Sequence, residues 1–492
     1  MIWLLIIPLV FSLAFFAVRA TGTRSLKLLD AMHVSGISLL LLASIRLVWV
    51  VIMRGHIFAL SGTLYADKLT AIFILVIGAM GFLNGLYSIG YMRHELEAGA
   101  ADEKALYRYY GFYHLFLFTM VLAVLPNNIV LMWVGIEATT LGSAFLVGFY
   151  GHKLSLEASW KYVLICSIGV GFALFGTILV YAGAFNAIDN ANASMLWSEI
   201  MKSAGHIDAA IMKLALVFLF LGYGTKAGFF PMHSWLPDAH SEAPSPVSSL
   251  LSGVLLNCAL YALVRYHMVA SRCLGPNYPR LLFLAFGVVS VTCAAFFIYG
   301  QRDLKRMLAY SSIENIGLIA TGLGVGGVLG VLASLLHLIN HSVAKSLLFC
   351  TSGNVLIKYR TRDLGAIRGL FRVAPYSAFL LGAGALAISG CPPFSIFISE
   401  LLTVAAGLRR GYLWLMVFLL LLLVIVFAAF LRLIGESVFG SPQRNVRAGD
   451  VPWPALVPVF LLLALVLGLG ICIPSPLYQL LKDAAYLVNY GI

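Results

Sequence analysis

Charged side chains are scarce in this sequence. They make up 11% of its 492 residues, whereas hydrophobic residues make up 61%. A soluble globular domain carries about 25% charged residues, so this composition excludes a water-soluble globule and also a disordered chain. The sequence predicts a protein that lies within a lipid bilayer.

Cysteine is also sparse, and its placement argues against several kinds of site. The seven cysteines stand far apart, with no Cys-x-x-Cys pair and no Cys/His cluster. Ligation of a metal, a haem or an iron–sulfur cluster is therefore not expected, nor is a disulfide framework. We expect no cofactor in this chain and assign any redox chemistry to a partner. No basic patch interleaved with aromatic residues is present, so nucleic acid is not an expected partner.

Long apolar runs, in contrast, follow one another along the whole chain. Each is close to the roughly 20 residues that a helix needs to cross a bilayer. We predict an all-α polytopic membrane protein with about 14 transmembrane helices and no soluble domain. The expected spans are 2–18, 31–53, 67–91, 108–124, 127–149, 158–184, 209–230, 246–268, 280–299, 304–322, 325–349, 374–403, 412–435 and 453–473.

The distribution of Lys and Arg predicts the orientation. If the N-terminus lies outside, the inside loops carry roughly twice as many Lys and Arg as the outside loops. Both termini are then expected on the outer face of a prokaryotic cytoplasmic membrane, with the tail 474–492 at the interface. Positive charges follow the first apolar run, which favours a retained helix over a signal peptide.

Ionisable residues interrupt several of these spans. A charge at bilayer depth costs at least about 2.5–3.5 kcal/mol, so such residues are rare and commonly functional. The sequence places here Glu137, Lys161, Lys226, Glu314, His337, His341, Lys345 and Glu400.

Three of these residues share one helix face. His337, His341 and Lys345 are spaced four residues apart, which predicts a polar stripe along one membrane helix. A lone membrane histidine often serves only a hydrogen bond between helices, and a stripe of three titratable groups favours function instead. Lys161 stands near the start of its span, so its side chain either belongs to the buried groups or reaches the interface.

Two spans carry helix-breaking residues close to an ionisable one. Gly228 and Pro231 follow Lys226 in the seventh span, and Gly390, Pro392 and Pro393 precede Glu400 in the twelfth. Proline lacks a backbone donor and clashes with the preceding turn, which predicts broken helices at both places. Paired interruptions in two halves are typical of a transport site.

The ionisable residues also recur at a nearly constant separation. This indicates that helices 4–8 and 9–13 are one five-helix unit used twice, the second copy inverted. The separations are 177 residues for Glu137 and Glu314, 176 for Lys161 and His337, and 174 for Lys226 and Glu400. The expected divisions are N-terminal helices in 1–107, the first repeat in 108–268, the second in 280–436, and helix 14 with the tail in 437–492.

Facing inverted repeats would bring these groups into a row near the midplane of the bilayer. A row of Lys, Glu and His side chains, reached through two broken helices, suits the passage of protons. A solute transporter or a purely structural anchor would show few ionisable groups in such a row.

Four segments carry a resemblance to a known family. They lie at 224–253 (GTKAGFFPMHSWLPDAHSEAPSPVSSLLSG), 301–317 (QRDLKRMLAYSSIENIG), 337–349 (HLINHSVAKSLLF) and 390–400 (GCPPFSIFISE). The sequence resembles the antiporter-like family shared by respiratory complex I, Mrp-type cation/proton antiporters and membrane-bound energy-converting hydrogenases. The likeness is greatest to the membrane subunit of hydrogenase-4 and formate hydrogenlyase complexes.

The resemblance implies roles for individual residues. Glu137 and Lys226 match the family's interacting pair, and the stripe on helix 11 matches its central relay. Glu400 occupies a position that is lysine in many members. Asn257 stands where the family commonly has a lysine on helix 8. Asparagine cannot carry that charge, so either water bridges the position or another group, such as Glu314, replaces it.

The resemblance also implies a function. We expect a proton-translocating subunit of a redox-driven complex, with other membrane subunits and a peripheral hydrogenase or quinone-reductase arm as partners. The alternative is a subunit of an Mrp-type Na⁺/H⁺ antiporter without a redox partner, because both kinds of complex use the same helices.

Overall fold

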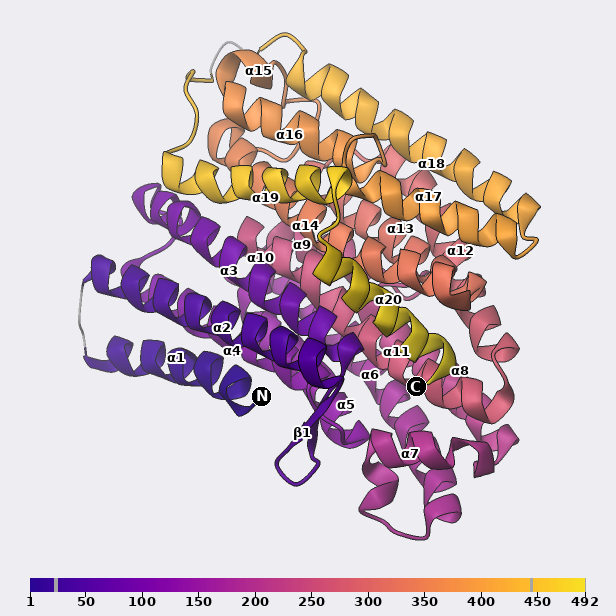
Figure 1. Cartoon of the computed structure of the whole chain (residues 1–492). Coiled ribbons are helices and arrows are strands. Elements are labelled where there is room, and N and C mark those ends of the chain that lie inside the picture. The colour runs from indigo at the N-terminus through magenta and orange to yellow at the C-terminus, as the bar shows by residue number, and fades with distance from the viewer. Residues whose placement is uncertain (22–24, 443–445, 492) are drawn as a thin grey trace.

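The chain folds into a bundle of long helices (Figure 1). The structure is a computed structural model that describes residues 1–21, 25–442 and 446–491. The first part of the chain forms α1 (Ile2–Thr21), α2 (Leu26–Arg54), β1 (Ile57–Ala59), β2 (Leu64–Ala66), α3 (Lys68–Glu97), α4 (Glu103–Val124), α5 (Ile129–Val147), α6 (Lys153–Ile188), η1 (Ala193–Met195), α7 (Trp197–Ser203), η2 (Ala204–His206), α8 (Ala209–Ala227) and α9 (Trp235–Glu242). The second part forms α10 (Ser245–Leu250), η3 (Leu251–Leu255), α11 (Leu256–Leu274), α12 (Asn277–Gly300), α13 (Leu304–Val325), α14 (Gly327–Tyr359), α15 (Leu370–Val373), α16 (Pro375–Ile388), α17 (Ser395–Arg409), α18 (Leu413–Leu433), η4 (Ile434–Val438), α19 (Trp453–Ile471) and α20 (Ser475–Tyr490).

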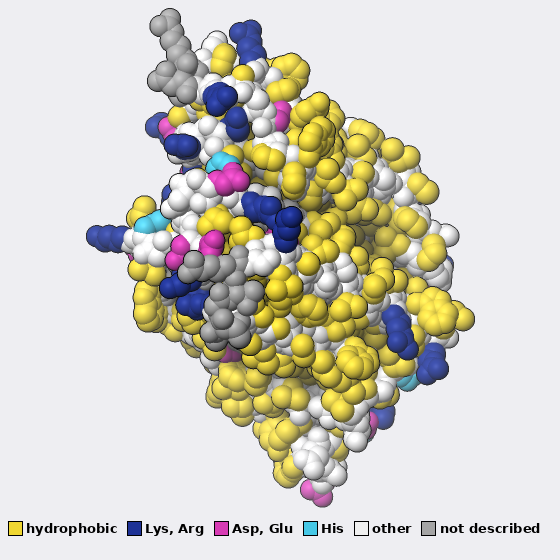
Figure 2. Space-filling view, turned by 90° about the vertical axis from the view of Figure 1, so that its left-hand side faces the viewer, with side chains coloured by type: hydrophobic (Ala, Val, Ile, Leu, Met, Phe, Trp, Pro, Cys, Tyr) yellow, Lys and Arg dark blue, Asp and Glu magenta, His cyan; other side chains and the backbone are white. Residues whose placement is uncertain are grey.

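Length and composition qualify eleven helices of the described residues as membrane spans. The prediction of a polytopic helical membrane protein is therefore confirmed. Helices also occupy the three remaining predicted ranges, as α4, α13 and the pair α16 and α17. Figure 2 shows hydrophobic side chains over most of one face, with charged side chains gathered mainly toward its left.

Three elements lie outside the expected membrane spans. A two-stranded antiparallel hairpin joins α2 to α3, and the short helix α7 lies in a stretch that we expected to be a loop. The tail contains the amphipathic helix α20, which packs its apolar side on α3 and α14 and buries Leu480, Leu481 and Ala484. The hairpin is too short, and α7 too polar, to register as a membrane span in a hydropathy pattern.

Both predicted breaks lie where glycine and proline interrupt the apolar runs. The helix α8 ends at Ala227, Gly228 takes a left-handed φ of 85°, and α9 begins only at Trp235. In the second half, α16 ends at Ile388, Gly390 has a φ of 70°, and α17 begins at Ser395. A positive φ favours glycine because it has no Cβ, and the prolines that follow cannot donate a helical hydrogen bond.

A wide turn in the eighth membrane segment brings α14 close. Residues Leu251–Leu255 form the π-helical turn η3 between α10 and α11. A Cβ on Gly253 would lie 2.9 Å from the carbonyl oxygen of Ser342, so only glycine permits this approach. At this turn the carbonyl oxygen of Gly253 accepts hydrogen bonds from two side chains. One is the hydroxyl of Ser342 on α14, and the other is the amide of Asn257 on the same segment.

The two ends of the bundle differ in charge. At one end, here called the basic end, the loops 148–152, 243–244, 301–303 and 360–369 meet through ion pairs and backbone contacts. At the other, the hairpin end, the β1–β2 hairpin contacts the segment before α5 and the start of α7, and Lys68 pairs with Asp483 of α20. In Figure 1 the hairpin and α7 lie at the bottom and α15 at the top.

A buried ion pair fixes the start of α3 at the hairpin end. Arg265 of α11 donates two hydrogen bonds of 2.7 Å to the carboxylate of Asp67, which also caps α3. Its guanidinium lies 4.3 Å from the centre of the Trp197 ring. Burial alone would raise the pKa of Asp67, but the Arg265 charge and hydrogen bonds hold that pKa below its usual value.

We predict that the basic end faces the cytoplasm. In cells expressing a variant without the exposed Cys472, an impermeant thiol reagent should label Asn192→Cys and leave Lys104→Cys unlabelled until the membrane is opened. Both positions are exposed, so burial does not decide the result. The reason is the excess of Lys and Arg on loops retained inside. Labelling of position 104 in intact cells, with protection of position 192, would reverse the orientation.

Candidate functional site

The stripe on α14 lies at the centre of the bundle. His337, His341 and Lys345 are each at most 1% exposed. They lie where α14 passes α3, α10 and η3 on one side and α13, α16 and α17 on the other. Because these helices cover α14 on all sides, the stripe faces protein rather than lipid.

The first residue of the stripe joins α14 to the second broken helix. His337 Nδ1 lies 2.9 Å from Ser399 Oγ of α17, and its Nε2 lies 3.1 Å from Asn315 Oδ1 of α13. Asn340 donates to the carbonyl oxygen of Ser395 at 2.7 Å, at the first residue of α17. These contacts hold the imidazole between two helices of the second half.

The last residue of the stripe is held by neutral groups. Lys345 Nζ donates to the carbonyl oxygen of Leu308 at 2.8 Å and to the hydroxyl of Ser311. No ion pair within 4.0 Å joins it to Glu314 in the part of the chain that the structure describes, although the two are within electrostatic reach. An amine with a hydroxyl partner can hold or release its proton without losing that partner, since a hydroxyl both donates and accepts.

Two carboxyl groups, the buried Glu314 and the partly buried Glu400, continue the row toward the second break. Glu314 is 1% exposed; Asn315 donates to one of its oxygens, and the other oxygen has no partner among the described residues. Glu400 lies within electrostatic reach of Glu314. Its carboxylate packs against Gly390, where any Cβ would collide with it. The break therefore gives the Glu400 side chain its space.

The first half holds its own lysine among hydroxyl groups. Lys226 is fully buried beside the break after α8 and donates to Thr140 at 2.8 Å and to Tyr162 at 2.7 Å. Glu137 of α5 accepts from Ser167 at 2.7 Å, and its other oxygen is buried without a partner. Within the described residues no ion pair of 4.0 Å or less joins Glu137 to Lys226, so the two charges are not in direct contact.

Asn257 stands between the two halves. Its amide donates to the Gly253 carbonyl at 2.8 Å and to Ser342 of α14 at 2.9 Å, while its own oxygen is buried and unpaired within the described structure. The next residue, Cys258, is within electrostatic reach of Lys226. The helix α11 packs against α8, which carries Lys226, and Asn257 joins it to α14 at Ser342.

Two buried imidazoles lack protein partners. Neither nitrogen of His341 nor of His240 makes a hydrogen bond to any described residue. The two rings are within electrostatic reach of each other, and His240 stacks on Phe349 with ring centres 5.1 Å apart. Buried polar atoms are rarely left unpaired in proteins and are commonly satisfied by internal water. Both histidines therefore present donor and acceptor atoms beside α14 that no described residue satisfies.

Lys161 does not belong to this buried row. Its side chain is 48% exposed and forms ion pairs with Glu157 at 2.7 Å and Asp238 at 3.4 Å. The sequence placed it about three residues into a span, but α6 begins at Lys153, so Lys161 is two turns from the basic end. A long lysine side chain reaches the boundary from that depth, which corrects the prediction in favour of the interfacial reading.

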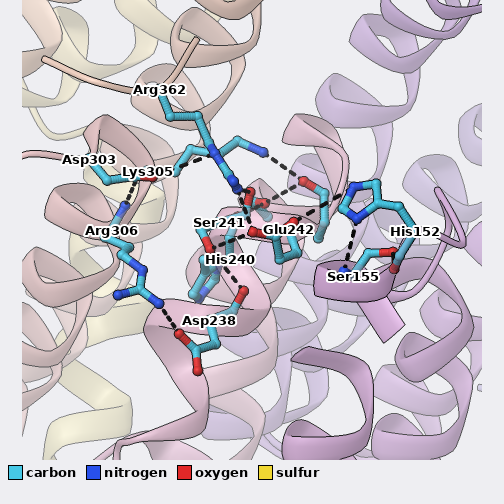
Figure 3. Close-up of polar contacts among 12 residues, drawn as sticks. His152, Ser155, Asp238, His240, Ser241, Glu242, Asp303, Lys305, Arg306 and Arg362 are labelled. Atoms are coloured by element: carbon cyan, nitrogen blue, oxygen red, sulfur yellow. Dashed lines mark hydrogen bonds and ion pairs between the residues drawn. The ribbon is translucent and has the colours of Figure 1, made fainter. Parts of the chain in front are cut away.

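A charged cavity at the basic end was not predicted. We call this cavity of about 600 Å³ the vestibule; its lining includes Glu95, His152, Glu242, Lys305 and Arg362. Figure 3 shows how α6, α9, α13 and the loop of Arg362 bring such residues together. The only signal in the sequence is the density of charge in the segments LPDAHSE and QRDLKR. Charged residues at helix ends are equally typical of an ordinary solvent-exposed surface, so the pattern does not indicate a cavity.

The vestibule reaches the row through α9. Arg362 pairs with Glu242 at 2.8 Å, and Lys305 donates to the Ala243 carbonyl at 2.6 Å (Figure 3). His240 lies half a turn earlier on the same helix, with its backbone oxygen accepting from Ser248 at 2.8 Å. Charged groups open to solvent are thereby only one short helix away from the unpaired imidazoles.

Among the described residues, no group of three or more His, Cys, Asp or Glu side chains could hold a metal ion. The titratable side chains and hydroxyl groups of the site can hold and pass protons.

These features define a class: a polytopic helical membrane protein whose buried ionisable side chains lie between two interrupted helices. The family described as NADH:quinone oxidoreductase/Mrp antiporter, transmembrane region, matches residues 126–426, and the N-terminal region of complex I chain 5 matches residues 49–101. The chain belongs to this family of antiporter-like membrane subunits, and the resemblance found in its motifs is confirmed.

Individual relatives agree with this assignment. A hydrogenase-4 component F homologue of Methylacidiphilum infernorum is 38% identical over 86% of this chain and 88% of the relative. Hydrogenase-4 component B of Escherichia coli is 31% identical over 82% of this chain and 61% of that protein. Among solved structures, a chain of the archaeal membrane-bound sulfane sulfur reductase is 25% identical, with a TM-score of 0.86 over 99% of this chain and 96% of its own length. A chain of Thermus thermophilus complex I shares the fold, at 22% identity and a TM-score of 0.80 over 99% of each chain.

Proposed function

We propose that this chain moves protons across the cytoplasmic membrane as a subunit of a redox-driven complex of the hydrogenase-4 type. The observation that carries the proposal is the buried stripe of α14, which has titratable groups on both sides and unpaired imidazoles beside it. Groups of this kind are costly in a membrane protein and persist where protons or ions pass.

The lysines suit repeated protonation. Lys226 is held by two hydroxyl groups and Lys345 by one hydroxyl and one carbonyl. A hydroxyl accepts from an ammonium and donates to a neutral amine, so each lysine keeps a partner in both states.

The vestibule supplies the row at the basic end. In this proposal a proton taken up among Glu242, Lys305 and His152 passes His240 and reaches His341 through internal water. From there it moves along α14 to Glu314 and Glu400 at the second break. The two inverted five-helix units, 108–268 and 280–436, would open toward opposite faces.

The energy source in this proposal is a redox partner. Its support is the likeness to two hydrogenase-4 components and to a chain of a respiratory membrane complex. This chain itself has no cysteine pattern for a redox centre. Other membrane subunits and a peripheral redox arm would complete the complex.

The alternative is a subunit of an Mrp-type antiporter. One Na⁺/H⁺ antiporter protein of Alkalihalophilus pseudofirmus is 31% identical over 70% of this chain, although over only 43% of its own length. The same row would then exchange protons for Na⁺ without electron transfer.

Isolation of the native complex tests both proposals. Purification through a tag on this chain should recover hydrogenase or quinone-reductase subunits, and vesicles holding the complex should acidify when the electron donor is added, with or without Na⁺. The reason is that the row contains proton-carrying groups and the relatives belong to redox complexes. Recovery of small antiporter subunits alone, together with proton movement driven by a Na⁺ gradient, would replace the first proposal by the second.

A further inference from the structure

A second cavity at the basic end lies apart from the proton row. It has a volume of about 460 Å³ and opens between the end of α12, the start of α13 and the end of α18. Two basic and two acidic side chains line it, Arg302, Arg432, Asp363 and Glu436. Nothing in the proposed proton path uses these residues.

Arg432 is preorganised at the wall of this cavity. One of its amino groups donates to the carbonyl oxygens of Tyr299, at 2.7 Å, and Gln301, at 3.4 Å, and the guanidinium lies 5.0 Å from the centre of the Tyr299 ring. A guanidinium has five N–H donors, so three remain for a ligand. Holding the arginine in place in advance lowers the entropy lost when an anion binds.

Glu436 does not neutralise Arg432. The two are four residues apart, a spacing at which Arg and Glu side chains commonly pair on a helix. Here the π-helical turn η4 begins between them, and no ion pair involving Glu436 or Arg302 occurs among the described residues. The cavity is therefore lined by an arginine and a glutamate that form no ion pair with each other in the described structure.

Ser437 lies in the wall of the same cavity. This residue lines the cavity, is 0% exposed, and its hydroxyl has no hydrogen-bond partner in the described part of the chain. A buried hydroxyl without a partner costs free energy unless a ligand or water satisfies it. Because this hydroxyl is buried, Arg432 and the exposed charges of Arg302 and Glu436 are the polar groups that a ligand in the cavity can reach.

The surroundings of the cavity are apolar on the lipid side. The helix α18 packs against α12, and Phe296, Leu431 and Phe439, each within three residues of a lining residue in the sequence, are 60%, 44% and 68% exposed. A ligand with a charged head and hydrocarbon tails matches a polar cavity at the end of two such helices. Basic pockets between helices near a membrane surface are known places for lipid headgroups.

We propose that this cavity binds the headgroup of a zwitterionic phospholipid that carries a primary ammonium, such as phosphatidylethanolamine. The phosphate accepts from Arg432 and Arg302, and the ammonium donates to Glu436. A purely anionic headgroup would face the uncompensated charge of Glu436 and Asp363, and a phosphatidylcholine headgroup has no N–H to donate to them. The proposal is independent of the proton path.

Native mass spectrometry of the purified full-length chain tests the lipid class. Titration in detergent should show phosphatidylethanolamine binding about tenfold more tightly than phosphatidylcholine or phosphatidylglycerol, because charge-assisted hydrogen bonds distinguish the headgroups. Arg432→Gln should weaken it by about tenfold and Arg302→Gln by less, since only Arg432 is preorganised. Glycerophosphoethanolamine at equal concentration should not displace the lipid, because it has no tails. Equal binding of all three lipids, or displacement by the free headgroup, would overturn the proposal.

A charge reversal tests the role of Glu436. Glu436→Lys should reverse the preference, so that phosphatidylglycerol binds better than phosphatidylethanolamine. Glu199→Lys, the same change on exposed α7 at the hairpin end, should leave the preference unchanged. An unaltered order of lipids in Glu436→Lys would contradict the assignment.

Cross-linking in membranes distinguishes a lipid from a neighbouring subunit. A photo-crosslinking residue at position 435 should capture phospholipid, since Gly435 has no atom within 4 Å of where a side chain would begin. Capture of a polypeptide from the assembled complex would make the cavity an interface between subunits and overturn the lipid proposal.

Discussion

Lys226→Ala and Glu137→Gln should each lower proton translocation by the assembled complex by at least about tenfold, the effect of a barrier higher by about 1.4 kcal/mol. Lys226 is the titratable group beside the first break, and alanine leaves Thr140 and Tyr162 without an ammonium between them. Glutamine at 137 keeps the contact with Ser167 but removes the ionisable carboxyl group that would interact with the charge of Lys226. The measurement is acidification of vesicles with the electron donor supplied and its turnover followed in parallel.

The double variant decides whether the two residues act together. Because one charge works through the other, the double variant should be no worse than the worse single one. Lys213→Ala is the matched control, since Lys213 lies on the same helix α8 with an exposed side chain. Its translocation should equal that of the wild type. Losses that add fully in the double variant would show that Glu137 and Lys226 contribute independently.

Glu314→Gln should reduce translocation against a membrane potential by about tenfold or more. Moving one charge against about 100 mV requires about 2.3 kcal/mol. A higher barrier in the middle of the proton path should therefore lower the rate most when a membrane potential opposes translocation. If Glu314 served packing, it would pair with another helix. Its one hydrogen bond is instead to the neighbouring Asn315, and its second oxygen is free within the described structure. Asn315 in turn contacts His337, which links the carboxyl group to the stripe.

Asn257→Lys should restore part of the translocation that Glu314→Gln loses. The amide at 257 already reaches Ser342 on α14, so a lysine there would place a titratable group next to the stripe. Glu314→Asp, which keeps a carboxyl group, should retain more activity than Glu314→Gln. Normal translocation by Glu314→Gln would rule out a relay role for this carboxyl. Failure of Asn257→Lys to rescue it would show that the route does not pass through position 257.

Much of the candidate site could be predicted because membrane burial makes ionisable residues conspicuous. A charge within an apolar run is visible without any structure, and this is how Glu314, Lys345 and Glu400 were found. The partners of those charges were not visible, because hydroxyl groups such as those of Thr140 and Tyr162 carry no signal in an apolar helix. The vestibule was missed for the opposite reason, since charged residues at helix ends are common.

The sequence by itself determined the membrane class, the order of the helices and the two breaks. Hydropathy fixes which segments enter a bilayer, and glycine followed by proline fixes where a helix cannot continue. Only the tertiary structure decided which charges are buried together. The rotation of each helix and its packing placed Lys161 at the surface, separated Glu137 from direct contact with Lys226, and brought Asn257 to Ser342 across 85 residues of chain. Such contacts depend on how distant helices fit against one another, as Gly253 does against α14, and no local pattern encodes that fit.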